Sequence, residues 1–281
     1  MIELRSGASL ATIDADRGGR LASLVVGGRD VIVGPPGEGD GTILWGSFLM
    51  APWCGRVEGG ALDWDGRTHR LPVNDEGNAI HGVLWDQSWT IEAVAEHTAV
   101  ISARFEPGGW PFAGLARQLF ELRDGELVTS AELLADEPMP AALGWHPWFN
   151  RTEEDPGLTI HSSHTLETRD LIPTGRRLPV DGTTDLRHGT AIGERLLDHC
   201  YTEVRSPALA EWPGFALEIA FDAPLTSTLV HTRATSFCIE PQSAWPTAIA
   251  LEAAGVPDTG LAILGAGDRL AASMAWRWRT D

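Results

Sequence analysis

The sequence predicts an all-β protein: a large antiparallel β-sandwich with few short helices, formed by one domain that spans residues 1–281. Three observations lead to this prediction. Apolar residues alternate with polar ones more often than they recur at helical spacing, turn dipeptides separate the alternating runs, and no repeat or linker divides the chain. With 281 residues and 43% apolar content, the chain can bury a substantial core in a single unit.

Turn dipeptides mark hairpins in the N-terminal half of the chain. A Gly-Gly pair at 27–28 separates LASLVV from DVIV. Asp-Gly pairs follow at 65–66, after ALDW, and at 124–125, between ARQLFEL and ELVTSAELL. Such dipeptides supply the positive φ angles that tight hairpins need, so we expect a pair of antiparallel strands around each.

Strand patterns are clearest in the C-terminal half. The segment FALEIAFD at 215–222 alternates strictly, and the closing segment alternates at Leu270, Ala272, Met274, Trp276 and Trp278. Both patterns predict strands with one buried face. The best helical candidate is TAIALEAAG, which follows Pro246 and is expected to end at Gly255 and Pro257.

The charge balance excludes several classes of partner. The chain has 39 acidic residues against 21 basic ones, all of them Arg, which gives a net charge of −18. A surface of this sign repels nucleic acid and anionic membranes, whereas a neutral small molecule is indifferent to it. The three cysteines are widely spaced without a CxxC pair, so neither a disulfide framework nor a zinc knuckle is expected.

The sequence shows no targeting or membrane-spanning segment. The opening residues MIELRSGASLATID lack a basic region followed by an apolar one, and no run of 18 apolar residues occurs. The expected location is therefore the cytoplasm.

Five titratable residues stand at or just beyond predicted strands, where loops carry functional groups on a rigid scaffold. They are Arg56 in APWCGRV, His81 in NAIHGVLW, His146 in GWHPWFN, Asp198 in LLDHCYTE and Glu240 in SFCIEPQSAW. Each residue taken alone is also compatible with a packing or turn role.

Tryptophan is the other candidate ligand-binding residue type, with 12 copies against one tyrosine. Several copies lie in loop-like contexts beside Pro or Gly: Trp53, Trp110, Trp148, Trp212 and Trp245. An indole can stack on the C–H face of a sugar, but large aromatic residues also dominate core packing. Both interpretations stay open for each of them.

Taken together, these segments resemble the aldose 1-epimerase (galactose mutarotase) family. HPWFN is similar to its HPYFN-type motif, and CIEPQSAWPTA to its Glu-Pro-Gln segment. NDEGNAIHG, APWCGRV, LLDHCYT and ILGAGDRLAASMAWRW resemble further family segments in the same order. The resemblance departs at Gly55, where Asn is usual, and at Val83, where a second Gly is usual.

The resemblance implies a galactose mutarotase-like supersandwich that opens and closes the ring of an aldose. It implies Glu240 as the base and His146 as the acid, with Arg56, His81, Asp198 and Trp148 at the sugar. It implies no metal and no organic cofactor. The expected partner is a small sugar, and the expected assembly is a monomer or homodimer.

Three other functions compete with this one. A hexose-6-phosphate 1-epimerase would need several Arg residues at one end of the pocket, with Arg56 and Arg117 as candidates. A non-catalytic sugar-binding module would keep the fold without turnover. A glycoside hydrolase would use Asp198 and Glu240 as its carboxylate pair. A metal site at His161 and His164, in IHSSH, is weaker still, because we expect these to be solvated loop residues.

Overall fold

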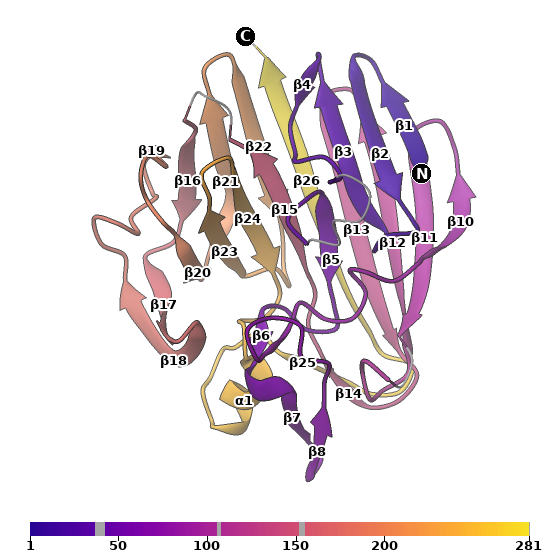
Figure 1. Ribbon diagram of the computed structural model, residues 1–281, viewed down its shortest axis with the longest axis vertical. Coiled ribbons are helices and arrows are strands. Elements are labelled where there is room, and N and C mark those ends of the chain that lie inside the picture. The colour runs from indigo at the N-terminus through magenta and orange to yellow at the C-terminus, as the bar shows by residue number, and fades with distance from the viewer. Residues whose placement is uncertain (37–42, 106–107, 152–154, 281) are drawn as a thin grey trace.

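Two large antiparallel sheets pack against each other face to face (Figure 1). The structure is a computed structural model that describes residues 1–36, 43–105, 108–151 and 155–280. The predicted β-sandwich is therefore confirmed. Among the described residues, no helix is long and apolar enough to cross a membrane.

The first sheet contains the strands that carry most of the predicted site residues. Its order is β1-β2-β3-β5-β15-β24-β23-β20-β17-β18, with β4 added beside β3. The strands are β1 (Ile2–Ser6), β2 (Ser9–Asp14), β3 (Arg20–Val26), β4 (Arg29–Asp30), β5 (Ser47–Met50), β15 (Gly144–Asn150), β17 (His164–Arg169), β18 (Ile172–Pro179), β20 (Asp198–Thr202), β23 (Ser227–Thr232) and β24 (Ser236–Gln242).

The second sheet has the order β10-β11-β12-β13-β26-β22-β21-β16-β19. Its strands are β10 (Thr90–Val94), β11 (Thr98–Phe105), β12 (Gly114–Arg123), β13 (Glu126–Ala135), β16 (Gly157–His161), β19 (Thr190–Ala191), β21 (Arg205–Trp212), β22 (Phe215–Phe221) and β26 (Arg269–Thr280).

Small elements cluster at one end of the sandwich, at the bottom of Figure 1. They are three two-stranded ribbons and two short helices: β6 (Arg56–Val57) with β9 (Ala79–Ile80), β7 (Ala61–Trp64) with β8 (Arg67–Arg70), β14 (Met139–Ala141) with β25 (Ala262–Leu264), η1 (Glu58–Gly60) and α1 (Ala248–Ala253).

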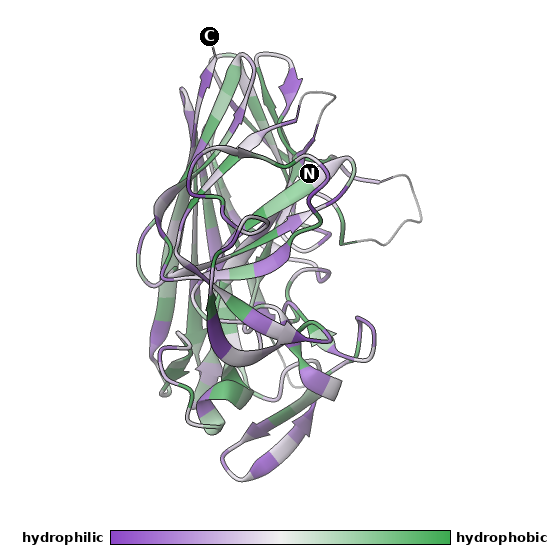
Figure 2. Cartoon of the chain, turned by 90° about the vertical axis from the view of Figure 1, so that its left-hand side faces the viewer, coloured by the Kyte–Doolittle hydropathy of each residue, from purple (hydrophilic) through white to green (hydrophobic). Residues whose placement is uncertain are grey.

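The main core lies between the two sheets. Alternate residues of β12, β13 and β22 point into it, and Figure 2 shows this alternation of hydropathy along the strands. In β22 the four predicted apolar residues are all buried. The turn pairs at 27–28, 65–66 and 124–125 connect β3 to β4, β7 to β8 and β12 to β13, as predicted. The predicted helix is α1, and Gly255 follows it with φ 80°.

The central strands of the first sheet are buried on both faces. In β5, β15 and β24 one set of residues, including Trp145 and Ile239, joins the main core. The opposite set, including Phe48, Trp148 and Cys238, forms a separate apolar cluster on the outer face of the sheet. Loops and small elements therefore cover that outer face, and this covering creates the enclosed space in which a site can form.

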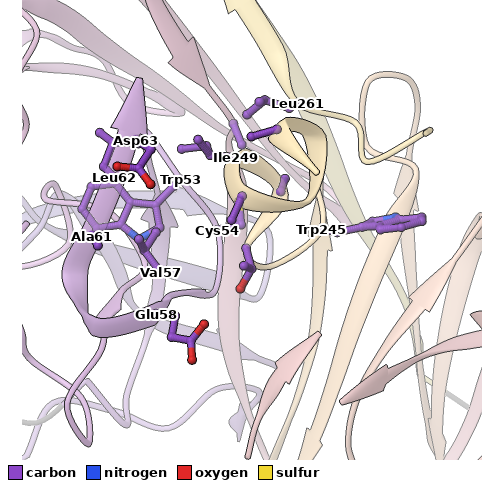
Figure 3. A pocket seen from close by; sticks show the side chains of 15 residues that line it. Trp53, Cys54, Val57, Glu58, Ala61, Leu62, Asp63, Trp245, Ile249 and Leu261 are labelled. Atoms are coloured by element: carbon purple, nitrogen blue, oxygen red, sulfur yellow. The ribbon is translucent and has the colours of Figure 1, made fainter. Parts of the chain in front are cut away.

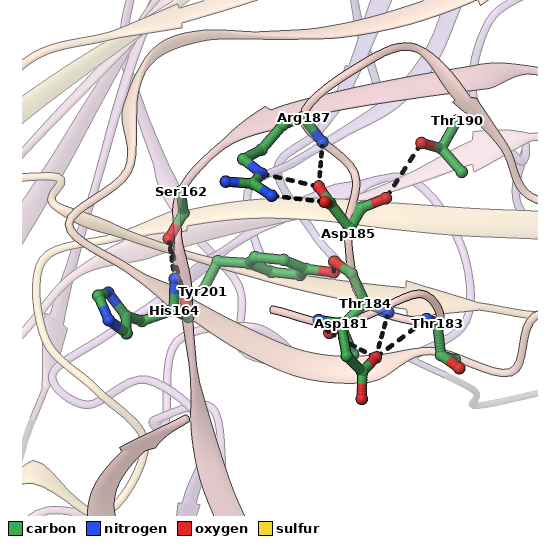
Figure 4. A network of polar contacts seen from close by, with 9 residues as sticks. All are labelled: Ser162, His164, Asp181, Thr183, Thr184, Asp185, Arg187, Thr190 and Tyr201. Atoms are coloured by element: carbon green, nitrogen blue, oxygen red, sulfur yellow. Dashed lines mark hydrogen bonds and ion pairs between the residues drawn. The ribbon is translucent and has the colours of Figure 1, made fainter. Parts of the chain in front are cut away.

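Hydrogen bonds around Tyr201 hold the segment at 181–190 against β20 (Figure 4). The Tyr201 hydroxyl donates to the carbonyl of Thr184 at 2.7 Å. Asp181 accepts from the backbone N–H of Thr184, and Asp185 accepts from the guanidinium of Arg187. The same strand, β20, begins at Asp198, which lines the site described next.

Candidate active site

His146 and Glu240 face each other on neighbouring strands of the first sheet. The register of β15 and β24 pairs Gly144 with Gln242 and Trp148 with Cys238, so His146 falls opposite Glu240 midway between these pairs. Nε2 of His146 lies 3.3 Å from Oε1 of Glu240. Side chains directly opposite each other in a sheet are close by construction, so the backbone ladder sets this approach.

Both members of the pair are almost completely buried, with 6% and 1% of their side chains exposed. The contact is not aligned as a hydrogen bond. Within the described residues, both carboxyl oxygens of Glu240 and Nδ1 of His146 lack a hydrogen-bond partner. Buried polar atoms in proteins are nearly always hydrogen-bonded, so this exception points to a group whose partner is a ligand.

Aromatic rings hold the imidazole of His146 in place. Phe48 stacks on it with ring centroids 4.8 Å apart, and Trp148 stacks on it at 5.0 Å. The ring of His81 meets it edge-on at 4.9 Å. Trp145, the other indole beside His146 in the sequence, belongs to the main core instead. Of the two indoles in GWHPWFN, only Trp148 therefore lies at the site.

A cavity of about 200 Å³ opens onto the pair. All six site residues predicted from the sequence line it, together with residues from several loops: Arg56, His81, His146, Trp148, Asp198 and Glu240. Typical sites for drug-sized ligands measure roughly 300–1,000 Å³. The volume of this cavity therefore suits a small ligand such as a monosaccharide.

Three further Asp, His or Arg residues of the pocket were not predicted from the sequence. Asp75 accepts a hydrogen bond from Nε of Arg56 at 2.8 Å. His231 stands opposite Asp198 in the register of β20 and β23, with Nδ1 3.7 Å from Oδ1. Arg233 also lines the cavity. Asp75 belongs to the NDEGNAIHG segment that the sequence had indicated, whereas His231 and Arg233 belong to a segment without a recognisable motif.

Burial shifts the pKa values of the pair toward the neutral forms. Desolvation, aided by the charge of Asp198, raises the pKa of Glu240 well above its ordinary value, although Arg56 opposes this. Desolvation, with His81 and His231 nearby, lowers the pKa of His146 well below its ordinary value. For His146, desolvation outweighs any attraction between the imidazolium and a nearby carboxylate.

Two neighbours of the pair, His81 and Asp198, differ in charge: His81 is neutral and Asp198 is ionised. Burial and the nearby Arg56 lower the pKa of His81 to about 3, so its imidazole is neutral at physiological pH. Burial acts to raise the pKa of Asp198, but the contact with His231 and the charge of Arg56 hold it below its ordinary value. The pocket thus offers a neutral imidazole and an ionised carboxylate to a ligand.

Close backbone packing positions His81. A Cβ atom at Gly82 would lie 1.9 Å from the carbonyl oxygen of Ala51, and the φ angle there is 79°. Similarly, a Cβ atom at Gly55 would lie 2.4 Å from Cβ of Pro246. The backbone N–H of His81 donates to the carbonyl of Gly55 at 3.0 Å, which ties the two segments together. Both glycines are therefore required by the space around them.

We expect Gly82→Ala to lower the free energy of unfolding by about 3 kcal/mol, because it adds a backbone clash to an unfavourable φ angle. Gly66→Ala is the matched control: its φ angle is 72°, but nothing lies within 4 Å of a Cβ atom there. For this control we expect about 1 kcal/mol. Urea denaturation of both variants measures the difference, and equal losses would contradict the close approach at Gly82.

The sequence profile of the aldose 1-epimerase family matches residues 1–275 of the chain. The chain belongs to the aldose 1-epimerase family. Galactose mutarotase of Rattus norvegicus is 27% identical over an alignment of 285 positions. The alignment covers 83% of this chain and 79% of the rat protein. Galactose mutarotase of Homo sapiens is 26% identical over 289 residues, with the same coverage of 83% and 79%.

Solved structures of aldose 1-epimerase relatives have the same fold. A galactose mutarotase-like protein from Clostridium acetobutylicum superposes with a TM-score of 0.86 at 17% identity, over 99% of this chain and 95% of its own. An aldose epimerase homologue from C. elegans gives a TM-score of 0.86 at 19% identity, over 99% and 98%. At these identities the likeness shows the fold alone.

Three residues that the sequence analysis named as candidates for other functions lie away from this pocket: Arg117, His161 and His164. Arg117 is on β12 in the second sheet, where it forms an ion pair with Glu92, so it cannot join Arg56 in binding a phosphate. His161 ends β16 and His164 begins β17, so the expectation that they are loop residues is wrong. Neither lines the pocket that contains His146 and Glu240.

The five tryptophans that the sequence analysis named in loop-like contexts are all buried, which favours packing for most of them. Trp110 and Trp212 belong to the main core. Trp53 and Trp245 line a second cavity, of about 260 Å³, beside α1 (Figure 3). Of the five, only Trp148 lines the cavity that contains the His146–Glu240 pair.

Proposed function

We propose that this protein interconverts the α and β anomers of a free aldose, with Glu240 as base and His146 as acid. The observation that carries the proposal is the buried pair itself. A carboxyl group and an imidazole lie 3.3 Å apart and open onto a cavity that suits a monosaccharide. Both carboxyl oxygens and Nδ1 of the imidazole lack a hydrogen-bond partner among the described residues. Family membership and the names of the galactose mutarotase relatives support the same reaction.

Ring opening needs two proton transfers in one small space. Glu240 accepts the proton of the C1 hydroxyl while His146 donates a proton to the ring oxygen, and the C1–O5 bond breaks to leave an aldehyde. Rotation about C1–C2 exposes the other face of the aldehyde. Closure reverses both transfers, so the pair regains its starting protonation. One proton shared by two groups is therefore sufficient for the whole cycle.

Burial of the pair favours the intermediate. Before ring opening the pair is charged on both members, and afterwards it is a neutral carboxylic acid and a neutral imidazole. A desolvated site disfavours the charged forms, as the directions of both pKa shifts express. Within the proposed cycle, burial therefore favours the charge state of the pair that accompanies the open aldehyde.

The remaining pocket residues are proposed to orient the sugar. The neutral imidazole of His81 has an unpartnered buried Nδ1 that can hydrogen-bond a hydroxyl group. Arg56 donates and Asp198 accepts, while Trp148 closes the pocket wall behind His146. Of the charged side chains that line the cavity, two are Arg, Arg56 and Arg233, and three are acidic, Asp75, Asp198 and Glu240. This balance favours an uncharged sugar over a sugar phosphate.

Polarimetry on freshly dissolved α-D-galactose, with α-D-glucose alongside, tests the proposal. We expect the protein to accelerate the relaxation of optical rotation without changing its final value. Hexose 6-phosphates and a β-galactoside in parallel measurements separate the competing functions. Acceleration with the phosphate alone, or release of reducing sugar from the glycoside, would overturn the proposed activity, and sugar binding without acceleration would indicate a binding module.

We expect Asp75→Asn to raise KM for the sugar about tenfold and to change kcat little. Asp75 holds the guanidinium of Arg56, and hydrogen bonds to charged groups contribute roughly 1.5–3 kcal/mol, with the lower end suited to this partly exposed pair. Initial-rate polarimetry separates the two constants, with the nearby exposed Glu58→Gln as control. A fall in kcat at unchanged KM would contradict a purely orienting role.

We also propose that the whole chain acts as one domain, as a monomer or homodimer, in the cytoplasm. These are predictions from the sequence pattern, the composition and the family resemblance. Sedimentation velocity of the purified protein distinguishes the two assembly states.

A further inference from the structure

We propose that His146, Cys238 and Glu240 form a binding site for a borderline-soft divalent cation such as Zn²⁺. One imidazole nitrogen, the Cys238 sulfur and one carboxylate oxygen all lie within 4.8 Å of one another, and all three residues are buried. No other group of three His, Cys, Asp or Glu residues with this spacing occurs in the described part of the chain. Imidazole, thiolate and carboxylate are the three ligand types that Zn²⁺ uses in proteins.

The sheet holds the three ligands on one face. Cys238 and Glu240 are two residues apart on β24, so their side chains project to the same side of the strand. His146 reaches the same space from β15, opposite Glu240. All three ligands thus stand on the same face of two paired strands, at neighbouring positions of that face. The site is therefore largely formed before an ion binds.

The distances suit tetrahedral coordination after a small movement of the thiol. Zinc–ligand bonds of roughly 2.0–2.3 Å at tetrahedral angles place neighbouring ligand atoms about 3.3–3.7 Å apart. Nε2 of His146 and Oε1 of Glu240 are already 3.3 Å apart. Cys238 is fully buried, and its sulfur lies within 4.8 Å of the other two ligand atoms, so a small rotation of its side chain completes the site.

Charge and access also agree with a divalent cation. A Zn²⁺ ion with one thiolate, one carboxylate and one neutral imidazole has no net charge, which removes the usual penalty for a buried ion. The protons displaced from the thiol and from the His–Glu pair leave to solvent through the cavity that His146 and Glu240 line. The same cavity supplies the fourth coordination position for water, as in sites with three protein ligands.

The unpartnered carboxyl oxygens of Glu240 are a second observation that points to a ligand. In the proposed function one carboxyl oxygen of Glu240 accepts the proton of a sugar hydroxyl group. The second oxygen is then available to a cation that is also bound by the thiolate of Cys238. A cation at this place contacts both groups to which we assign the proton transfers. The site is thus inhibitory: an ion bound there excludes the sugar from the pair.

The experiment measures binding and does not depend on the proposed activity. Reduced, chelator-treated wild-type protein is titrated with CoCl₂, and a thiolate-to-Co²⁺ charge-transfer absorption in the near ultraviolet is recorded. Calorimetric titration with ZnCl₂ gives the affinity. We expect Cys238→Ala to lose the absorption and to weaken Zn²⁺ binding at least about 100-fold, since loss of an outer-shell partner alone costs roughly 10–100-fold.

Cys54→Ala is the matched control, because Cys54 is also a buried free cysteine but lies outside the cluster. It should keep both the absorption and the affinity. Absence of the absorption in wild type, its persistence in Cys238→Ala, or its loss in Cys54→Ala would each overturn the proposal. If Cys238→Ala does not fold, as judged by its melting transition, the spectra of wild type and Cys54→Ala still decide.

Discussion

Replacing Glu240 with glutamine is expected to lower kcat for anomer interconversion about 10²–10⁴-fold, the usual contribution of a positioned general base. Glutamine has nearly the same shape but cannot accept the proton of the C1 hydroxyl. Affinity for D-galactose should change little, because Arg56, His81 and Asp198 are unaltered. Polarimetry measures the rate and calorimetry the binding.

Glu96→Gln is the control for this substitution, because 82% of the Glu96 side chain is exposed and it lies away from the pocket. It should retain the wild-type rate. Near-normal turnover by Glu240→Gln would show that another group removes the proton.

His146→Gln is expected to produce a loss of similar size, about 10²–10⁴-fold in kcat, because the amide cannot donate the proton that the ring oxygen needs. Glutamine fills much of the space that the imidazole occupies between Phe48 and Trp148, so the rings of these two residues stay apart. His97→Gln, at a half-exposed surface histidine, is the matched control and should be fully active.

The double variant Glu240→Gln/His146→Gln gives the sharper result. If the two groups act as one unit, the double variant should be only slightly slower than either single variant, since removing one member already disables the other. Multiplication of the two losses would instead show two independent contributions and would contradict a shared proton.

Most of the fold was accessible from the sequence because its signals are local. The alternation in β22 and β26 and the Gly-Gly and Asp-Gly turns specify strands and hairpins without reference to the rest of the chain. The order of strands was not accessible, because β5, β15 and β24 become neighbours through crossovers between distant segments. No local pattern encodes those contacts.

In the candidate site, too, some residues could be predicted from the sequence and others could not. Six residues could be named because they stand in recognisable segments, and the structure brings all six to one cavity. His231 could not be named, since its role arises only from the register that sets it opposite Asp198. The lowered pKa of His146 could not be predicted either, because it follows from the extent of burial, which is a property of the folded chain.

The origin of the pocket residues suggests how this scaffold can diversify. The distance between His146 and Glu240 is fixed by hydrogen-bonded strands at the centre of a sheet. Arg56 and Asp75 come instead from a short ribbon and its connecting loop, and His81 directly follows that ribbon. In the proposed function, changes in the ribbon therefore alter the residues around the sugar while the distance between His146 and Glu240 stays constant. An engineer seeking a new substrate would graft loops onto this chain and leave β15 and β24 untouched.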